Sequence, residues 1–202
     1  MQNKKIHLAV PITENRVGNM GALSSVMYAR EELVRQGCMV KVLCFGAYDE
    51  LIADVAKYKP CFAAIVEGYD GKVDLEVYHQ VLPDWDRYKA SSMAARDIIR
   101  HTIRMRKMHN RYVQAGYAMQ WLQRLNAAAV YVRLGMDRLD MDEMFMQGRA
   151  IVLGISVGRH AHMPPQSADI HIPQTHPACP NTTPNMKIWI FWNGDKGSSK
   201  TK

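Results

Sequence analysis

The chain has 202 residues, of which 48% are hydrophobic and 22% are charged, and its formal net charge is +7. This is the composition of a globular domain, and no apolar run approaches the roughly 18 residues of a membrane span, so a membrane protein is excluded. Four cysteines without a CxxC pair, and an apolar N-terminal run too short for a signal peptide, predict a reducing, cytoplasmic location.

Alternating strands and helices are predicted over residues 4–70. Strands that are buried on both faces and joined by helices are typical of a parallel sheet with right-handed connections. We therefore expect an α/β fold, a Rossmann-like three-layer sandwich with a mainly parallel sheet. Apolar runs predict strands at 4–12, 38–46 and 61–68, and amphipathic segments predict helices at 22–37 and 47–60.

The rest of the chain is predicted to add a helical segment and further strands to the same domain, which would span residues 1–195. Residues 91–126 would form one bent helix or two helices hinged at Gly116, a basic helical insertion between the 4–70 unit and the strands of 127–195. The other expected elements are short helices near 75–82 and at 139–148, strands at 127–135, 149–158, 168–173 and 187–194, and a disordered tail at 196–202. Residues 127–135 could also continue the preceding helix, but their β-branched content favours a strand.

The loop after the first predicted strand is a candidate phosphate site, because ligands of open parallel sheets bind beyond the carboxyl ends of the strands. Its glycines would let the backbone approach a ligand, and its serines would lie in the first turn of a helix, whose amides favour phosphate. It contains neither a GxGxxG nor a P-loop motif, and glycines that only turn the chain into a helix explain it equally well. The candidate ligand-binding residues are Gly18, Asn19, Gly21, Ser24 and Ser25.

Carboxylates follow the second and third predicted strands. Asp49 and Glu50 are better explained as first-turn acids that stabilise the helix dipole. Glu67 and Asp70 are the candidate catalytic residues, because a carboxylate at a strand end can be held rigidly and partly away from water, as a general base or as an acceptor for a sugar hydroxyl. A solvated loop is the alternative interpretation of this pair.

A histidine-rich segment lies near the C-terminus. Four histidines and a cysteine within 20 residues would suffice for a transition-metal site, but their spacing matches no zinc motif, so we do not expect a metal there. The residues concerned are His160, His162, His171, His176 and Cys179.

The excess positive charge is confined to residues 96–136, which carry eight Lys or Arg and one acid, whereas the rest of the chain is nearly neutral. Most of this charge lies in a row of basic residues on one face of a predicted helix. Like charges four residues apart on a helix repel one another, at a cost of a few tenths of a kcal/mol per pair. An anionic partner would remove that repulsion, and an acidic segment of the same chain, such as 137–143, would do so without any function. The candidate phosphate- or nucleic-acid-binding residues are Arg96, Arg100, Arg104, Lys107 and Arg111.

Residues 4–70 carry a pattern that resembles the N-terminal Rossmann-like half of GT-B glycosyltransferases, including those of bacteriophages. The matching parts are the glycine-containing loop after the first strand, the helix and strand around "ALSSVMYAREELVRQGCMVKV", and "KYKP" leading into a strand that ends in an acid. The resemblance implies transfer of a sugar from a nucleotide-sugar donor, with the Gly18–Gly21 loop near the donor phosphates or the acceptor and with Glu67 or Asp70 near the acceptor. A GT-B enzyme needs a second Rossmann half, and the remaining residues, about 130 in number, cannot supply one. A homodimer could complete such an enzyme.

The leading functional hypothesis is a cytoplasmic, glycosyltransferase-like protein, catalytic or not, that binds a nucleotide or nucleotide-sugar at the carboxyl ends of its strands. The alternative is a nucleic-acid-binding protein that uses the helix 96–111 on a phosphate backbone. A third possibility is an assembly or host-interaction protein. None of these hypotheses requires a membrane, and no cofactor is certain.

Overall fold

The computed structural model describes residues 4–69, 75–81, 84–105, 111–135 and 141–161, which lie in one compact unit within residues 1–166. The strands are β1 (Lys5–Pro11), β2 (Met39–Phe45), β3 (Phe62–Tyr69), β4 (Leu75–His79), β5 (Arg111–Ala115) and β6 (Ala128–Gly135). The helices are α1 (Arg16–Arg35), α2 (Tyr48–Tyr58), α3 (Trp85–Met105), α4 (Gln120–Gln123) and α5 (Met141–Ala161). No helix in these ranges is long and apolar enough to cross a membrane.

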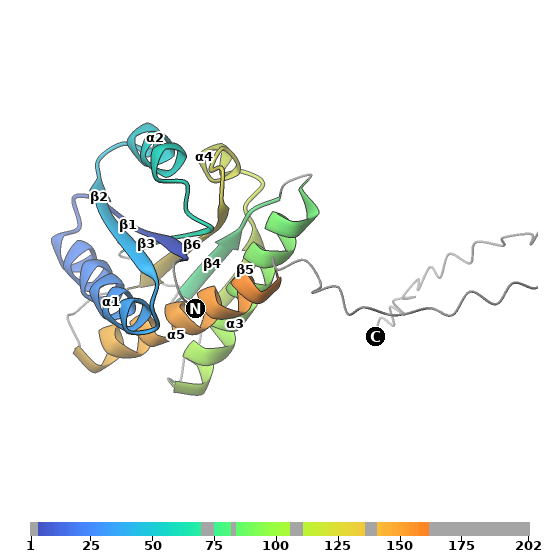
Figure 1. The fold of residues 1–202 in the computed structure, drawn as a ribbon. Helices are drawn as coiled ribbons and strands as arrows, with labels where there is room; N and C mark the ends of the chain where they lie inside the picture. Colours follow the sequence, from blue (N-terminus) through green and yellow to red (C-terminus); the bar gives the residue numbers. More distant parts are fainter. Residues whose placement is uncertain (1–3, 70–74, 82–83, 106–110, 136–140, 162–202) are drawn as a thin grey trace, which may run out of the picture. The chain divides into compact units, whose positions relative to one another are not determined.

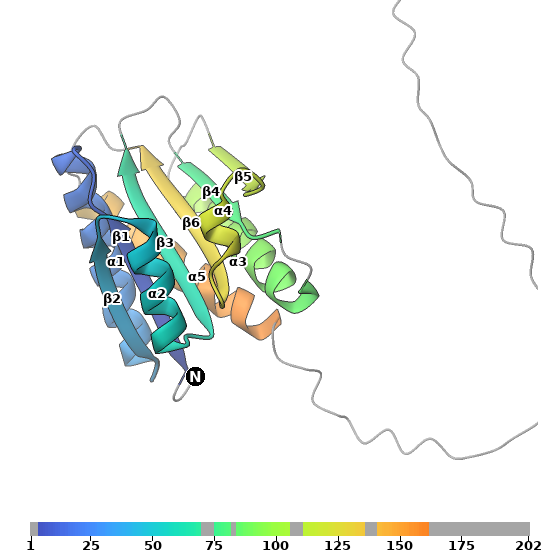
Figure 2. The same cartoon turned by 90° about the horizontal axis from the view of Figure 1, so that it is seen from above.

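The strands form one sheet in the order β2-β1-β3-β6-β4-β5. Strands β1, β2, β3 and β6 are parallel, whereas β4 is antiparallel to β6 and parallel to β5. Helices α1, α3 and α5 cover one face of the sheet, and α2 and α4 cover the other (Figures 1 and 2). The expected three-layer α/β architecture with a mainly parallel sheet is therefore confirmed, although an antiparallel strand within the sheet makes the arrangement not specific to Rossmann folds.

Two apolar cores lie on the two faces of the sheet because the central strands are apolar at successive positions. In β3, Phe62, Ala64 and Val66 face the layer of α1, α3 and α5, whereas Ala63 and Ile65 face the layer of α2 and α4. This explains why a continuous apolar run, rather than an alternating one, marks the central strands. The predicted elements of residues 4–70 are confirmed, and Gly37 ends α1 in the left-handed conformation expected there (φ 80°).

The predicted strand at 149–158 is wrong, because these residues lie within α5. Helix α5 packs against both α1 and α3 over the sheet, so most of the apolar residues between 149 and 158 are buried and this run carries little helical periodicity. Its glycines permit close packing of the helices: a Cβ on Gly148 would lie 2.6 Å from the carbonyl oxygen of Ser25, and one on Gly158 would lie 2.5 Å from that of Ala90.

Two further expectations fail in the middle of the chain. Residues 75–79 form β4 rather than a helix, with Leu75, Val77 and His79 buried and the intervening side chains half-buried, which is the alternation of a strand. Within 91–126 only the first part is a long helix, because α3 ends at Met105 and residues 111–115 form β5. The strand at 127–135 is confirmed as β6, and the strands and tail predicted beyond residue 161 lie outside the described residues.

Candidate functional site

The glycine-containing loop is shorter than predicted, because α1 already begins at Arg16 and Asn15 caps it by accepting a hydrogen bond from the Gly18 amide (2.9 Å). Gly18 and Gly21 are both buried in α1, and a Cβ on Gly18 would lie 2.6 Å from the carbonyl carbon of Gly68 in β3. This contact indicates that Gly18 serves close packing of α1 on the sheet, a role that neither the ligand hypothesis nor the turn into a helix predicted.

The other candidate ligand residues of this segment also make internal contacts. Asn19 accepts from the amide of Thr13 (3.1 Å) and donates to its carbonyl oxygen (2.7 Å), which closes the connection between β1 and α1. The Ser25 hydroxyl is buried and donates to the carbonyl oxygen of Gly21 (3.0 Å). Ser24 is half-buried beside Met27 on the outer side of α1. The structure therefore does not bring the five predicted residues together around one cavity.

The two acids that follow β2 lie in the first turn of a helix, as expected for residues that stabilise the helix dipole. Asp49 and Glu50 are in the first turn of α2. Glu50 accepts a hydrogen bond from the amide of Gly46 (3.2 Å), and Asp49 forms an exposed ion pair with Arg124 (3.0 Å). Their interpretation as first-turn acids is confirmed.

Glu67, one of the two predicted catalytic residues, lies at the carboxyl end of β3 in an ionic cluster built by three strands. The strand register pairs Arg133 of β6 with Glu67 on one side and with Glu76 of β4 on the other. The Arg133 guanidinium lies 2.8 Å from the Glu76 carboxylate and 3.5 Å from that of Glu67. Tyr69 lies under the guanidinium, with its ring centroid 4.1 Å away. We call Glu67, Glu76 and Arg133 the ionic triad.

The ionic triad is half-withdrawn from water, which changes its acid–base properties. The Glu67 side chain is 16% exposed, and this burial raises its pKa, although the Arg133 charge opposes the rise. Burial by itself would lower the pKa of Arg133, but the carboxylates of Glu67 and Glu76 outweigh it and raise that pKa. Glu67 is therefore a carboxyl group whose pKa is shifted towards neutrality and whose partner is a permanent cation, a combination suited to proton transfer.

Aromatic side chains form a row beside the ionic triad on the same face of the sheet. Tyr48 of α2 stacks on Trp121 of α4 with ring centroids 4.2 Å apart, and Trp121 meets the edge of Tyr131 at 5.1 Å. Tyr131 is followed by Tyr78 of β4 at 5.9 Å, and the Tyr78 hydroxyl donates to Glu76 (3.1 Å). This aromatic row joins α2, α4, β6 and β4 and ends on the ionic triad.

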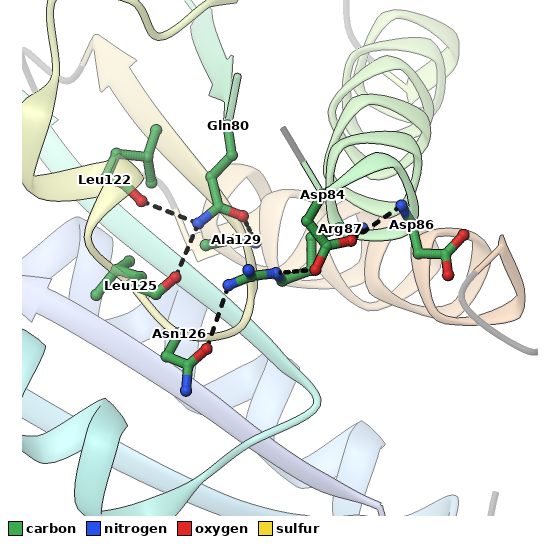
Figure 3. Close-up of polar contacts among 8 residues, drawn as sticks. All are labelled: Gln80, Asp84, Asp86, Arg87, Leu122, Leu125, Asn126 and Ala129. Carbon is green, nitrogen blue, oxygen red and sulfur yellow. Dashed lines mark hydrogen bonds and ion pairs between the residues drawn. The ribbon is translucent and has the colours of Figure 1, made fainter. Parts of the chain in front are cut away.

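Gln80, which sequence reasoning missed, holds the segment that follows Trp121. Its buried amide donates to the carbonyl oxygens of Leu122 (2.9 Å) and Leu125 (3.2 Å) and accepts from the amide of Ala129 (2.8 Å) (Figure 3). One side chain thereby satisfies three backbone groups, one in α4, one in the connection to β6 and one in β6 itself. The signal in the sequence was a glutamine directly after an apolar alternation, but it was hidden by the wrong assignment of β4 as a helix.

Asp84, Arg87 and Asn126 tie the start of α3 to the same connection between α4 and β6. Asp84 accepts from the backbone amides of the first turn of α3 and pairs with the Arg87 guanidinium (2.6 Å), which also donates to the side chain of Asn126 (3.2 Å) (Figure 3). The connection that joins Trp121 and Tyr131, two members of the aromatic row, is thus anchored from two sides.

The remaining predicted site residues cannot be placed around the ionic triad. Asp70, His162, His171, His176 and Cys179 lie outside the described residues, and His160 lies in the last turn of α5, where its side chain is not described. Within the described parts of the chain, no group of three His, Cys, Asp or Glu side chains could hold a metal ion.

The basic row is confirmed over α3 but not beyond it. Arg96, Arg100 and Arg104 are exposed on one side of the helix, and Arg100 pairs with Asp97 (3.1 Å). The expected helix over 96–111 is wrong at its C-terminal end: Lys107 lies outside the described residues, and Arg111 begins β5, with its side chain not described.

Comparison with solved structures finds a similar fold in N-acetylmuramoyl-L-alanine amidases. The N-acetylmuramyl-L-alanine amidase Ami1 from Mycobacterium abscessus is 11% identical (TM-score 0.61), covering 78% of this chain and 99% of that one. The amidase AmiC2 of Nostoc punctiforme is 12% identical (TM-score 0.56; 76% and 95%), and so is the catalytic domain of the CD27L endolysin targeting Clostridia difficile (TM-score 0.57; 76% and 97%). No family model and no curated protein matches the chain.

These neighbours overturn the resemblance to GT-B glycosyltransferases, whose fold they do not have. The functions predicted for the chain are wrong as well. These were a glycosyltransferase-like enzyme with a nucleotide or nucleotide-sugar ligand, a nucleic-acid-binding protein, and an assembly or host-interaction protein. The same correction applies to the phosphate-bearing ligand and the nucleic acid predicted as partners, and to the homodimer invoked to complete a GT-B enzyme. At 10–19% identity the likeness establishes a shared fold, that of N-acetylmuramoyl-L-alanine amidases, over about three quarters of the chain.

Proposed function

We propose that this protein hydrolyses an amide bond in peptidoglycan, as an N-acetylmuramoyl-L-alanine amidase does, and that Glu67 transfers the proton. The fold supports this proposal because the match extends over at least 95% of several amidase domains. The observation that carries it is the position of Glu67: a half-buried carboxyl with a raised pKa, at the carboxyl end of a central parallel strand, beside a guanidinium.

The ionic triad can perform both proton transfers of amide hydrolysis. The Glu67 carboxylate would accept a proton from a water molecule as the water oxygen bonds to the carbonyl carbon of the amide. Arg133 would donate hydrogen bonds to the oxygen that becomes negatively charged. The Glu67 carboxyl would then return the proton to the amide nitrogen as the carbon–nitrogen bond breaks, leaving a carboxylic acid and a free amine. Glu76 would hold Arg133 in position through their 2.8 Å ion pair.

The aromatic row supports a substrate that contains sugar rings. Faces of tyrosine and tryptophan rings pack against the C–H face of a sugar, and the row lies directly beside the ionic triad. A glycan strand on Tyr48, Trp121 and Tyr78 would bring the attached peptide to Glu67. The site would then be an open surface rather than an enclosed cavity, which suits a polymeric substrate.

The experiment is digestion of purified peptidoglycan, with products identified by liquid chromatography and mass spectrometry. We expect peptides with a newly freed alanine amine and glycan strands that retain the matching carboxyl group. Glu67→Gln should lower the rate by about 100-fold or more, the usual contribution of a general base. Asp49→Asn is the matched control, because it removes an exposed carboxylate 3.0 Å from an arginine and should leave the rate unchanged.

Two results would contradict the proposal. One is the absence of any amine release by the wild-type protein from peptidoglycan of several chemotypes. The other is release by the Glu67→Gln variant at the wild-type rate, with circular dichroism establishing that both proteins are folded. The pH profile gives a further test, because activity should rise as pH increases through the raised pKa of Glu67.

A further inference from the structure

Helix α3 presents a regular row of exposed side chains that no part of the proposed active site uses. The opposite side of the helix is buried against the sheet and α5 through Ala94, Ala95 and Ile98. Successive members of the exposed row are separated by four, four, three, four and four residues, the spacing of a single helix face. We call them the α3 row: Trp85, Lys89, Met93, Arg96, Arg100 and Arg104.

The charges of the α3 row are poorly compensated within the structure. Arg100 is 61% exposed and pairs with Asp97, but Lys89, Arg96 and Arg104 form no ion pair with any residue of the described ranges. Arg96, Arg100 and Arg104 follow one another at four-residue spacing, where like charges repel. Water-exposed helices ordinarily mix charges of both signs, so a row of this kind is suited to an external anion.

Apolar side chains alternate with the cations in the first half of the α3 row. Trp85 is 68% exposed and Met93 is 38% exposed, and both lie next to Lys89 on the helix surface. A partner that fits the α3 row therefore carries negative charges interspersed with small apolar groups. This combination argues against a purely ionic contact with a small anion.

The sheet topology brings the Arg104 end of the α3 row to the edge of the sheet that carries the ionic triad. Strand β4 is antiparallel to β6, so β4 begins at the edge where β3 and β6 end, and Glu76 lies there beside Arg133. Strand β5 is parallel to β4 and begins at the same edge. Helix α3 connects β4 to β5 and must run back towards that edge, on the face of the sheet opposite α2 and α4 (Figure 1).

We propose that the α3 row binds the carboxylate groups of peptidoglycan stem peptides and holds the protein on the polymer near its site of cleavage. This inference rests on the proposed function, which names the polymer. Guanidinium groups bind carboxylates through paired hydrogen bonds, and alanine methyl groups of the same peptides would pack on Trp85 and Met93. Several weak carboxylate contacts along about 20 residues of helix add up through multivalency to a bond that a single contact could not make.

The test measures binding without hydrolysis, by co-sedimentation of the Glu67→Gln protein with insoluble peptidoglycan at low temperature. Replacing Arg96, Arg100 and Arg104 together by glutamine should weaken binding at least tenfold, and added salt should weaken binding of the parent protein. The matched control replaces three exposed cations of α1 and α2 by glutamine, namely Arg16, Arg35 and Lys57. Its net charge changes by the same amount, and it should bind like the parent protein.

Two treatments of the polymer identify the anion. Converting the peptide carboxylates to amides should abolish binding, whereas removing phosphodiester polymers with hydrofluoric acid should leave it intact. The proposal is overturned if phosphodiester removal abolishes binding, if amidation has no effect, or if the α3 variant binds as well as the control. Because every protein in this test already carries Glu67→Gln, a failure of binding is distinguishable from a failure of peptidoglycan digestion.

Discussion

Replacing Gly68 by alanine tests the close contact between α1 and β3 on which the candidate site is built. Gly68 follows Glu67 in the strand, but it faces α1 on the other side of the sheet. A Cβ at this position would lie 2.5 Å from the Cα of Gly18 and nearer still to the Gly18 carbonyl group. Both neighbours are backbone atoms of a helix, so neither can rotate out of the way.

The size of the effect follows from this distance. Ordinary Cβ contacts begin at about 3.4 Å, so α1 must move away from β3 by about 1 Å, and its buried residues Val26 and Leu33 lose contact with the sheet. Overpacking of a core costs about 1–3 kcal/mol, and a clash with backbone lies at the upper end, so we expect about 3 kcal/mol. For a chain of this length that corresponds to a fall in melting temperature of roughly 6–12 °C.

The assay is thermal unfolding followed by circular dichroism, with Gly46→Ala as the matched control. A Cβ on Gly46 would meet no atom within 4 Å, so this variant should melt at or slightly above the wild-type temperature, by up to about 1 kcal/mol of added stability. The reasoning is refuted if Gly68→Ala melts within about 2 °C of Gly46→Ala.

Three further predictions concern polar groups. Gln80→Leu should lower the free energy of unfolding, measured in urea, by about 3 kcal/mol, because two backbone carbonyl groups and one backbone amide lose their partner. The control Gln120→Leu, at an exposed position, should change it little, and equal effects of the two variants would contradict the role of Gln80. Arg133→Met should destabilise the protein by about 2 kcal/mol at pH 7 and by less at lower pH, because burial raises the pKa of Glu67, and once Glu67 is protonated it no longer repels the Glu76 carboxylate; a loss independent of pH would argue against the ionic triad. Burial lowers the pKa of His7, despite its 2.8 Å contact with Asp54, so the unfolded chain binds more protons than the folded chain as pH decreases from 6.5 through the lowered pKa, and stability should fall over this range. His7→Leu should weaken this dependence of the melting temperature on pH, and an unchanged dependence would exclude His7 as its source.

Much of the fold could be predicted because the first half of the chain alternates apolar strands with amphipathic helices, and each element is recognisable from its own residues. Glu67 could be chosen as a candidate because an acid at the carboxyl end of an apolar strand has a defined place at the sheet edge. The α3 row could be predicted as far as Arg104, since its spacing is a property of one helix.

The failures occur where neighbours far away in the sequence decide the structure. The apolar residues of 149–158 are compatible with a strand or a buried helix, and packing between α1 and α3 selects the helix. The GT-B resemblance failed for a related reason, because parallel α/β units of different folds share the same local pattern of strands, helices and glycines.

The sequence by itself determined a parallel α/β unit, a carboxylate at the end of its third strand and a cationic helix face, since these depend on periodicities within single elements. Only the tertiary structure decided that β4 lies antiparallel beside β6, and that Glu67, Glu76 and Arg133 therefore meet. The physical reason is register: residues from three strands become neighbours only when hydrogen bonding across the sheet aligns them, and no spacing along the chain records that alignment.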